Sequence, residues 1–171
     1  MSAWLMQVER QGRALVPAFS MLALLVLGLI PWHIPGLTNV TPAYLLIGLY
    51  FWTLYQPQRL PYWSTFLIGL AQDLLLGLPP GQGALALLLV QGLIASQRRF
   101  LLSKPFLVVW WGFGVIGPIA ALIGWGVASI ARQAFIPVLP VFIQCVMTIL
   151  LYPLFGGLFG WLQERVVRPV P

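Results

Sequence analysis

Charged residues are scarce in this sequence. Only 7% of its 171 residues are Asp, Glu, Lys or Arg, whereas 60% are hydrophobic. Soluble globular domains contain about 25% charged residues, so this composition excludes a protein that is surrounded by water on all sides. The mean hydropathy of +0.94 indicates lipid as the solvent. Because the apolar runs follow one another with only short breaks, we expect residues 1–171 to form a single membrane domain that crosses the bilayer several times.

Acidic residues, cysteine and histidine are also nearly missing. The chain has three acidic residues and single copies of Cys145 and His33. A lone cysteine inside an apolar run excludes an internal disulfide and argues against a cysteine-based metal site. His33 lies in a polar break, where we interpret it as an interfacial residue. The sequence has no glycine-rich phosphate loop, no pair of carboxylates and no serine, histidine and aspartate at one membrane depth. We therefore predict no enzymatic activity, no cofactor and no metal.

The net charge of +6 raises the question of nucleic-acid binding. However, the basic residues form no continuous patch, and they stand in the breaks between apolar runs. This spacing is typical of a membrane protein whose loop charges set its orientation. We interpret the positive charge as a topology signal, exclude nucleic acid as a partner and expect lipid as the surrounding medium.

Six apolar runs have about the length that a transmembrane helix needs. They cover residues 14–31, 42–56, 61–78, 82–97, 105–131 and 136–162. We therefore predict an all-α membrane protein with six transmembrane helices. With six spans, one basic residue, Arg132, falls on the outer side. The others fall on the side of the termini, namely Arg10, Arg13, Arg59, Arg98, Arg99, Lys104, Arg165 and Arg168. Because basic loops stay in the cytoplasm, we predict that both termini are cytoplasmic.

Asp73 is the only acidic residue between Glu9 and Glu164, and it stands inside the third apolar run. On a helix, residues four positions apart are neighbours on one face. Gly69, Asp73 and Gly77 have this spacing, so the carboxylate is expected between two positions without side chains. A charged residue in a membrane helix is costly and points to a function. We favour folding or partner docking over proton transfer, because a proton relay needs several titratable groups and no other carboxylate lies in the spans.

The segment after Asp73 predicts where the third helix ends. Pro79 and Pro80 disfavour helical geometry, so the helix is expected to end near Leu78. Asp73 then lies about 7 Å beneath its outer end. Arg132 is the one cation on the predicted outer side and ends the fifth helix at a similar depth. This matched depth leads to the hypothesis of an ion pair between Asp73 and Arg132.

Small residues recur at intervals of four in the last two runs. Ala120, Gly124 and Ala128 form one such seam, and Gly156 and Gly160 form another. Seams of this kind let two helices approach closely in lipid. We interpret the first as general helix packing rather than as a specific dimer face.

Several short motifs follow one another along the chain. They are the basic N-terminus, Pro42-Ala43-Tyr44-Leu45-Leu46 with Tyr50-Phe51-Trp52, Pro57-Gln58-Arg59, Phe66 with Gly69, Asp73, Gly77 and Gly81 at intervals of four, and Leu151-Tyr152-Pro153. In their order and spacing they resemble the MreD family of rod-shape-determining proteins. The resemblance and the charge pattern together assign structural or partner-docking roles to Pro42, Pro57, Arg59, Gly69, Asp73, Gly77, Gly81, Arg132 and Pro153. The role of Arg132 comes from the charge pattern alone.

The resemblance implies a multi-pass protein of the bacterial inner (cytoplasmic) membrane that has no catalytic activity of its own. Proteins of this family act with MreC, the actin-like MreB, the glycosyltransferase RodA and a class B penicillin-binding protein. Together they direct lateral peptidoglycan synthesis and maintain rod shape. The expected function is therefore that of a scaffold in the cell-elongation machinery.

The family is also similar in six-helix architecture to the substrate-binding S components of energy-coupling factor vitamin transporters, which gives the alternative function. An S component is expected to carry an Ala-x-x-x-Ala docking patch on its first helix, and Ala14 and Ala18 have that spacing. It also needs polar groups at an outward-facing cavity. The outer loops offer only Thr38, Asn39, Thr41 and Gln82, which is a small set for a high-affinity site.

Overall fold

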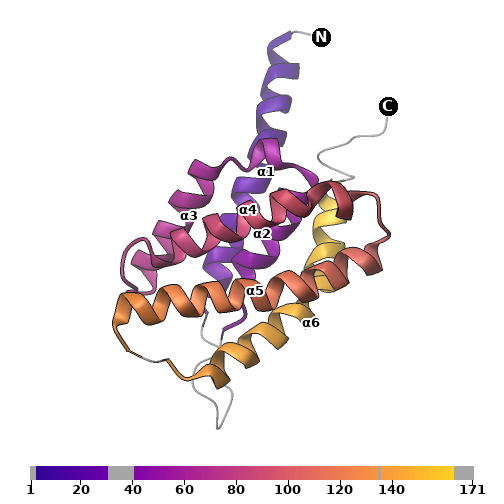
Figure 1. The fold of residues 1–171 in the computed structure, drawn as a ribbon. Coiled ribbons are helices and arrows are strands. Elements are labelled where there is room, and N and C mark those ends of the chain that lie inside the picture. The colour runs from indigo at the N-terminus through magenta and orange to yellow at the C-terminus, as the bar shows by residue number, and fades with distance from the viewer. Residues whose placement is uncertain (1–2, 31–40, 135, 164–171) are drawn as a thin grey trace.

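The computed structural model describes residues 3–30, 41–134 and 136–163, with side chains from residue 16 onward. This part is all helical and contains no strand, which confirms the predicted all-α class. Its elements are α1 (Ala3–Gly28), α2 (Tyr44–Tyr55), the 3₁₀ turn η1 (Pro57–Arg59), α3 (Tyr62–Leu75), α4 (Gln82–Leu102), α5 (Phe106–Arg132) and α6 (Val138–Leu162). The start of α1 and the end of α6 lie toward the same end of the bundle (Figure 1).

The helices coincide with the six predicted runs, but several boundaries differ. α1 begins well before residue 14, and α3 ends at Leu75 instead of near residue 78. The fourth run was expected to end at residue 97, whereas α4 continues to Leu102 and includes Arg98 and Arg99. Arginine and glutamine are polar and therefore end an apolar run, yet both have a high helix propensity. A change in polarity therefore does not have to end a helix.

Three of the described helices, α4, α5 and α6, are long and apolar enough to cross a membrane. Residues 16–28 of α1 and the whole of α2 are apolar but shorter. At a rise of about 1.5 Å per residue, the 12 residues of α2 extend over about 18 Å, less than the roughly 30 Å hydrocarbon core of a bilayer. The structure thus describes a membrane protein, while the count of six crossings stays a prediction.

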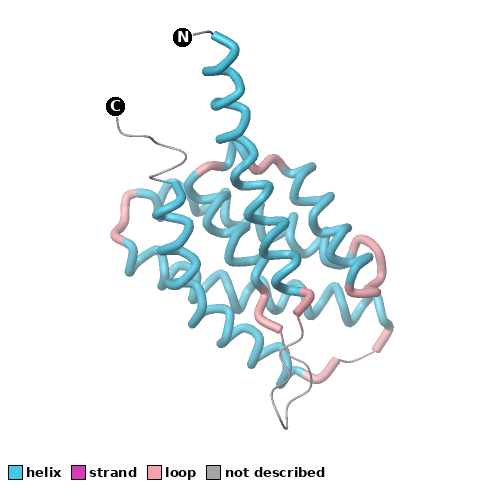
Figure 2. The backbone as a smooth tube through the Cα atoms, turned by 180° about the vertical axis from the view of Figure 1, so that it is seen from behind, coloured by secondary structure: helices cyan, strands magenta, loops and turns pink. Residues whose placement is uncertain are grey.

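The short helix α2 lies at the centre of the bundle. Its residues from Tyr44 to Leu54 are all buried, and it contacts α1, α4 and α6. Viewed from behind, the connecting loops lie at the ends of the helices (Figure 2). A helix that is apolar on all sides is typical of such a buried position.

Aromatic residues join α2 to its neighbours. The ring of Tyr50 packs edge-to-face on Phe113 of α5 at 5.0 Å and on Tyr152 of α6 at 5.5 Å between centroids. The Tyr50 hydroxyl donates a hydrogen bond to the Val109 carbonyl at 3.0 Å. These partners give the phenol both an apolar contact and a satisfied polar end, so the Tyr50-Phe51-Trp52 motif is part of the core.

The predicted small-residue seams contribute to packing only in part. Ala120 and Ala128 are buried, but no atom lies within 4 Å of a Cβ built on Gly124 or Gly160. A Cβ on Gly156 would lie 3.4 Å from the ring of Phe106. Other predictions fall outside the described residues or side chains, namely those for Arg10, Arg13, Ala14, His33, Thr38, Asn39, Arg165 and Arg168.

Candidate functional site

The Asp73 carboxylate closes the turn between α3 and α4. Asp73 is completely buried, with 0% of its surface exposed. Its Oδ2 accepts a hydrogen bond from the Gly81 N–H at 2.9 Å, and its Oδ1 accepts one from the Gly83 N–H at 2.8 Å. The Gly83 and Ala84 nitrogens also lie 3.0 Å and 3.4 Å from Oδ2. The carboxylate thus satisfies N–H groups for which the first turn of α4 has no intrahelical partner.

This arrangement supplies the helix cap that α4 lacks in its own sequence. Gly81 occupies the N-cap position and has no side chain to cap the helix. The negative charge of Asp73 also lies at the positive end of the α4 dipole. Hydrogen bonds to charged groups each stabilise a fold by about 1.5 to 3 kcal/mol, which offsets part of the cost of burying the carboxylate. The stability of α4 therefore depends on a side chain from α3.

Gly77 ends α3. It has φ +63°, the left-handed conformation that glycine adopts without strain. The Leu78 N–H donates to the Asp73 carbonyl at 2.8 Å, and the Gly77 N–H donates to the Leu74 carbonyl at 3.4 Å. These two bonds form a Schellman motif. The expectation that Gly77 lies on the helix face and that the prolines end the helix is therefore wrong, because the chain leaves the helix before Pro79.

Two further glycines let the backbones of α3 and α4 meet. A Cβ on Gly69 would lie 2.5 Å from the Ala84 Cα and 2.9 Å from the Ala84 nitrogen. A Cβ on Gly83 would meet the Oδ1 of Asp73. Gly81 has φ +93°, so it turns the chain back toward the carboxylate. The structure thus brings Gly69, Asp73, Gly77 and Gly81 together at one end of the α3 and α4 pair.

Arg132 lies apart from this group. It is the last residue of α5 and is exposed. Within the described part of the chain, all hydrogen bonds of the Asp73 carboxylate go to backbone N–H groups, and no ion pair joins it to Arg132. The hypothesis of an Asp73–Arg132 pair is not supported. Nearby N–H donors satisfy the carboxylate without the cost of desolvating a guanidinium.

The remaining predicted residues are spread over the bundle. Pro42 lies before α2, and its carbonyl accepts a hydrogen bond from the Tyr44 N–H at 2.9 Å. Pro57 and Arg59 begin and end η1. Pro153 lies within α6. None of these residues contacts the Asp73 carboxylate through a described hydrogen bond.

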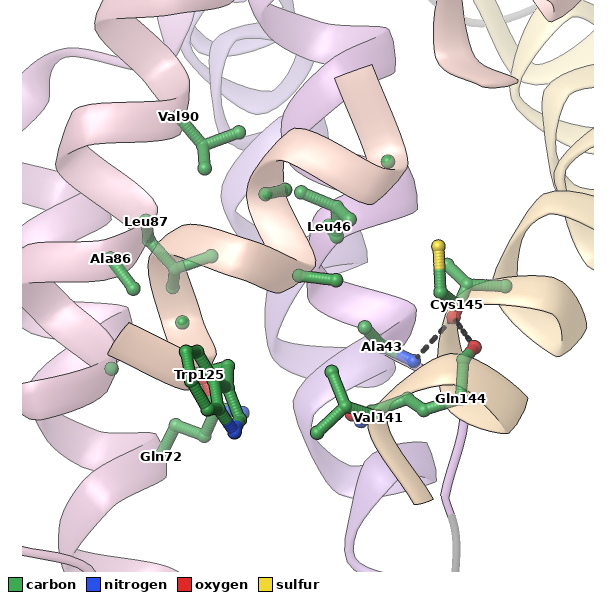
Figure 3. A pocket seen from close by; sticks show the side chains of 16 residues that line it. Ala43, Leu46, Gln72, Ala86, Leu87, Val90, Trp125, Val141, Gln144 and Cys145 are labelled. Atoms are coloured by element: carbon green, nitrogen blue, oxygen red, sulfur yellow. Dashed lines mark hydrogen bonds between the residues drawn. The ribbon is translucent and has the colours of Figure 1, made fainter. Parts of the chain in front are cut away.

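A cavity of about 190 Å³ adjoins the Asp73 turn. Gln72 of α3 and Gly83 of α4 line it near the turn. Trp125 of α5 and Gln144 of α6 also line it, and Figure 3 labels Trp125 next to Gln72 and Gln144 across the view. The start of α2 forms part of the wall through Ala43. The same Gly83 therefore contacts the carboxylate and borders the cavity.

Polar side chains of α6 cap the start of α2 at this cavity. The Ala43 N–H donates to Thr148 Oγ1 at 3.0 Å, and that hydroxyl donates to the Gln144 carbonyl at 2.6 Å. The Gln144 amide donates to the Thr41 carbonyl at 2.8 Å. This network was not predicted from the sequence. Its only signal is that Gln144 and Thr148 are polar residues four positions apart in an apolar run.

The cavity can form hydrogen bonds, but none of its lining residues is charged. Amides, a hydroxyl and the Cys145 thiol are available there. Its volume of about 190 Å³ is below the roughly 300 to 1,000 Å³ of common small-molecule sites. In the described residues, no group of three or more His, Cys, Asp or Glu side chains is placed to hold a metal. The arrangement therefore suits helix packing better than binding of a vitamin-sized ligand.

Comparisons with known proteins give a consistent relationship. The family model described as "rod shape-determining protein MreD" matches residues 8–162. A Haemophilus influenzae protein named "Rod shape-determining protein MreD" is 32% identical over 84 residues, which are 49% of this chain and 46% of that protein. The match thus spans about half the length of this curated relative. No solved structure matches the chain.

Proposed function

Because the chain belongs to the MreD family of rod shape-determining proteins, we propose that it is a non-catalytic membrane scaffold of the bacterial cell-elongation machinery. The observation that carries this proposal is the family match over residues 8–162. It gives the protein a role in cell shape. The family is one of shape-determining proteins and is not a known enzyme family.

The proposed partners are those of the rod-shape system. The scaffold contacts MreC and, with it, MreB, RodA and a class B penicillin-binding protein, and it thereby organises lateral peptidoglycan synthesis. It is a multi-pass protein of the inner membrane that forms one domain over residues 1–171. Pro42, Pro57, Arg59 and Pro153 are proposed to serve structure or docking in this assembly.

The use of Asp73 supports a scaffold rather than a proton carrier. Its carboxylate accepts hydrogen bonds from the N–H groups of Gly81 and Gly83, and a carboxylate at this position stabilises the start of a helix. Stable helix packing at this turn is therefore the favoured role, and the outer helix surfaces are left for partners.

The proposed topology has six crossings with cytoplasmic termini. It is supported by the basic residues on the terminal side and by the position of the start of α1 and the end of α6 at one end of the bundle (Figure 1). Reporter fusions after residues 36, 80 and 134 are expected on the outer side, and fusions after residues 58, 101 and 168 in the cytoplasm. A reversed result at 58 and 101 rejects this topology.

Depletion and co-purification test the scaffold directly. Depleting the protein in its own host should give round cells, and expression of the wild-type chain should restore rods. After mild detergent extraction, MreC should remain bound to the tagged protein. The proposal would be refuted in favour of the S-component alternative if depleted cells stayed rod-shaped and the purified protein carried a bound vitamin or a transporter ATPase. The uncharged cavity gives that alternative no specific support.

A further inference from the structure

A second cavity lies at the other end of α2, away from Asp73. Its volume is about 330 Å³, and its walls are Tyr55, Gln56, Pro57, Gln58, Arg59 and Arg98. The last residue of α2, the turn η1 and the last part of α4 thus bring two arginines to one hollow. In the part of the chain that the structure describes, no acidic side chain lines this cavity.

One hydrogen bond holds the guanidinium of Arg98 in place, but its other N–H donors are not used by the described residues. Its Nε donates to the Leu54 carbonyl at 2.8 Å, where it also compensates the negative end of the α2 dipole. An arginine has five N–H donors in a planar fork, so four remain on Arg98. They have no partner among the described residues. Within the same cavity wall, the side-chain Oε1 of Gln56 is buried and has no hydrogen-bond partner in the described part of the chain.

The chemistry of this lining fits a phosphate diester. Arginine forks bind phosphate oxygens in pairs, and such charge-assisted bonds are stronger than neutral ones. Arg59 and Arg98 supply positive charge from two different elements.

The exposed side chains that neighbour the cavity in sequence are of the kind expected at the level of lipid headgroups. Tyr62 and Trp63 begin α3 after the two residues that follow η1, and they are 54% and 67% exposed. Exposed tyrosine and tryptophan are typical of the interface between membrane and water. Phe100, two residues after Arg98, is 62% exposed. A phosphate in the cavity would thus have apolar, lipid-facing side chains beside it for acyl chains.

We propose that this cavity binds the phosphate of an anionic phospholipid through Arg59 and Arg98. Basic pockets between transmembrane helices on the cytoplasmic side are a known physical solution for holding such headgroups. The bound lipid would bridge η1 and the end of α4 and so fix the end of α2 that the proposed topology places on the cytoplasmic side. This inference goes beyond the scaffold role and does not depend on the identity of any protein partner.

Lipid retention by the purified full-length protein provides the test. Wild-type protein in nanodiscs of phosphatidylcholine with a minor share of phosphatidylglycerol should enrich phosphatidylglycerol around it, as measured by native mass spectrometry after release. The double variant Arg59→Gln/Arg98→Gln should lose about tenfold or more of this selective retention. The control Arg99→Gln/Lys104→Gln removes the same number of positive charges, but from exposed neighbouring positions outside the cavity. This control should change retention by less than about threefold.

Two further experiments identify the source of the phosphate and distinguish a loss of lipid binding from misfolding of the variant. Inorganic phosphate at millimolar concentration should not displace the retained lipid; stoichiometric displacement would assign the cavity to free phosphate and overturn the lipid proposal. On the wild-type protein, a photoreactive phosphatidylglycerol should crosslink to peptides that contain residues 55–63 or 98–102. Crosslinks elsewhere only, or an equal loss of retention in both double variants, would refute the proposal even if the Arg59 and Arg98 variant fails to fold.

Discussion

The N–H of Gly83 lies 2.8 Å from Oδ1 and 3.0 Å from Oδ2 of Asp73, so both carboxylate oxygens face the same backbone donor. This relationship explains how the chain keeps an acidic side chain completely buried in an otherwise apolar helix pair. The charge is balanced by aligned peptide N–H groups at a helix start instead of by a cation. The role of Asp73 is therefore to join α3 to α4.

Replacing Asp73 by Asn should destabilise the protein while keeping its shape. The carboxamide has one oxygen in place of two, and its NH₂ group would face N–H donors that it cannot accept. We expect a loss of about 2 kcal/mol, which corresponds to a melting temperature that is lower by about 4 to 8 °C. Thermal unfolding in detergent measures this. An unchanged melting temperature together with normal rod shape in complemented cells would show that the charge is dispensable.

Arg132→Gln should have almost no effect on stability. Arg132 is exposed at the end of α5 and makes no ion pair with Asp73. Changes at such surface positions are usually within about 0.5 kcal/mol. The exchange variant Asp73→Arg/Arg132→Asp should be as unstable as Asp73→Arg alone in the same unfolding assay. Recovery of stability in the exchange variant would restore the ion-pair hypothesis.

Gly69→Ala should disrupt the contact between α3 and α4. The added methyl group would lie 2.5 Å from the Cα of Ala84, and overpacking of this kind costs about 1 to 3 kcal/mol. Gly92→Ala is the matched control, because a Cβ at Gly92 of α4 meets no atom within 4 Å. Since alanine favours helix over glycine by about 0.5 to 1 kcal/mol, Gly92→Ala should be neutral or stabilising. Equal melting temperatures for the two variants would contradict the close approach at Gly69.

Thr148→Val tests the capping of α2 by α6. Valine keeps the shape of the side chain but removes the hydroxyl that accepts the Ala43 N–H. An unsatisfied buried donor costs about 1 to 3 kcal/mol, so the melting temperature should fall. Thr148→Ser keeps the hydroxyl and should lose less. Hydrogen exchange at the start of α2 would locate the effect, and unchanged protection there in Thr148→Val would argue against the cap.

The sequence allowed the fold class and the membrane environment to be predicted, because composition and long apolar runs depend on no tertiary contact. It also singled out Asp73, a lone acidic residue among glycines. Its partner was predicted wrongly because charge patterns reveal only side chains. The donors to Asp73 are peptide N–H groups that reach it through the left-handed conformations of Gly77 and Gly81, and backbone donors have no sequence signature.

The central position of α2 was not predictable for a related reason. Its twelve residues are apolar on every side. The sequence pattern of such a segment does not distinguish a helix surrounded by lipid from one surrounded by protein. The capping of its start by Gln144 and Thr148 involves residues about a hundred positions away. Contacts of this range arise from the arrangement of the whole bundle, and a single sequence records only the isolated polar residues that make them.

The burial of α2 has a consequence for how the protein is made. Translation proceeds from the N-terminus, so α2 is synthesised before α4 and α6, which cover two of its sides. Until these helices arrive, the nascent chain presents the apolar surface of α2 and the unpaired Ala43 N–H to lipid or to the insertion machinery. A ribosome that stalls between α2 and α4 should therefore leave an intermediate that membrane proteases degrade, whereas the completed chain resists them. The first half of the molecule is therefore the part that quality control during insertion is expected to recognise.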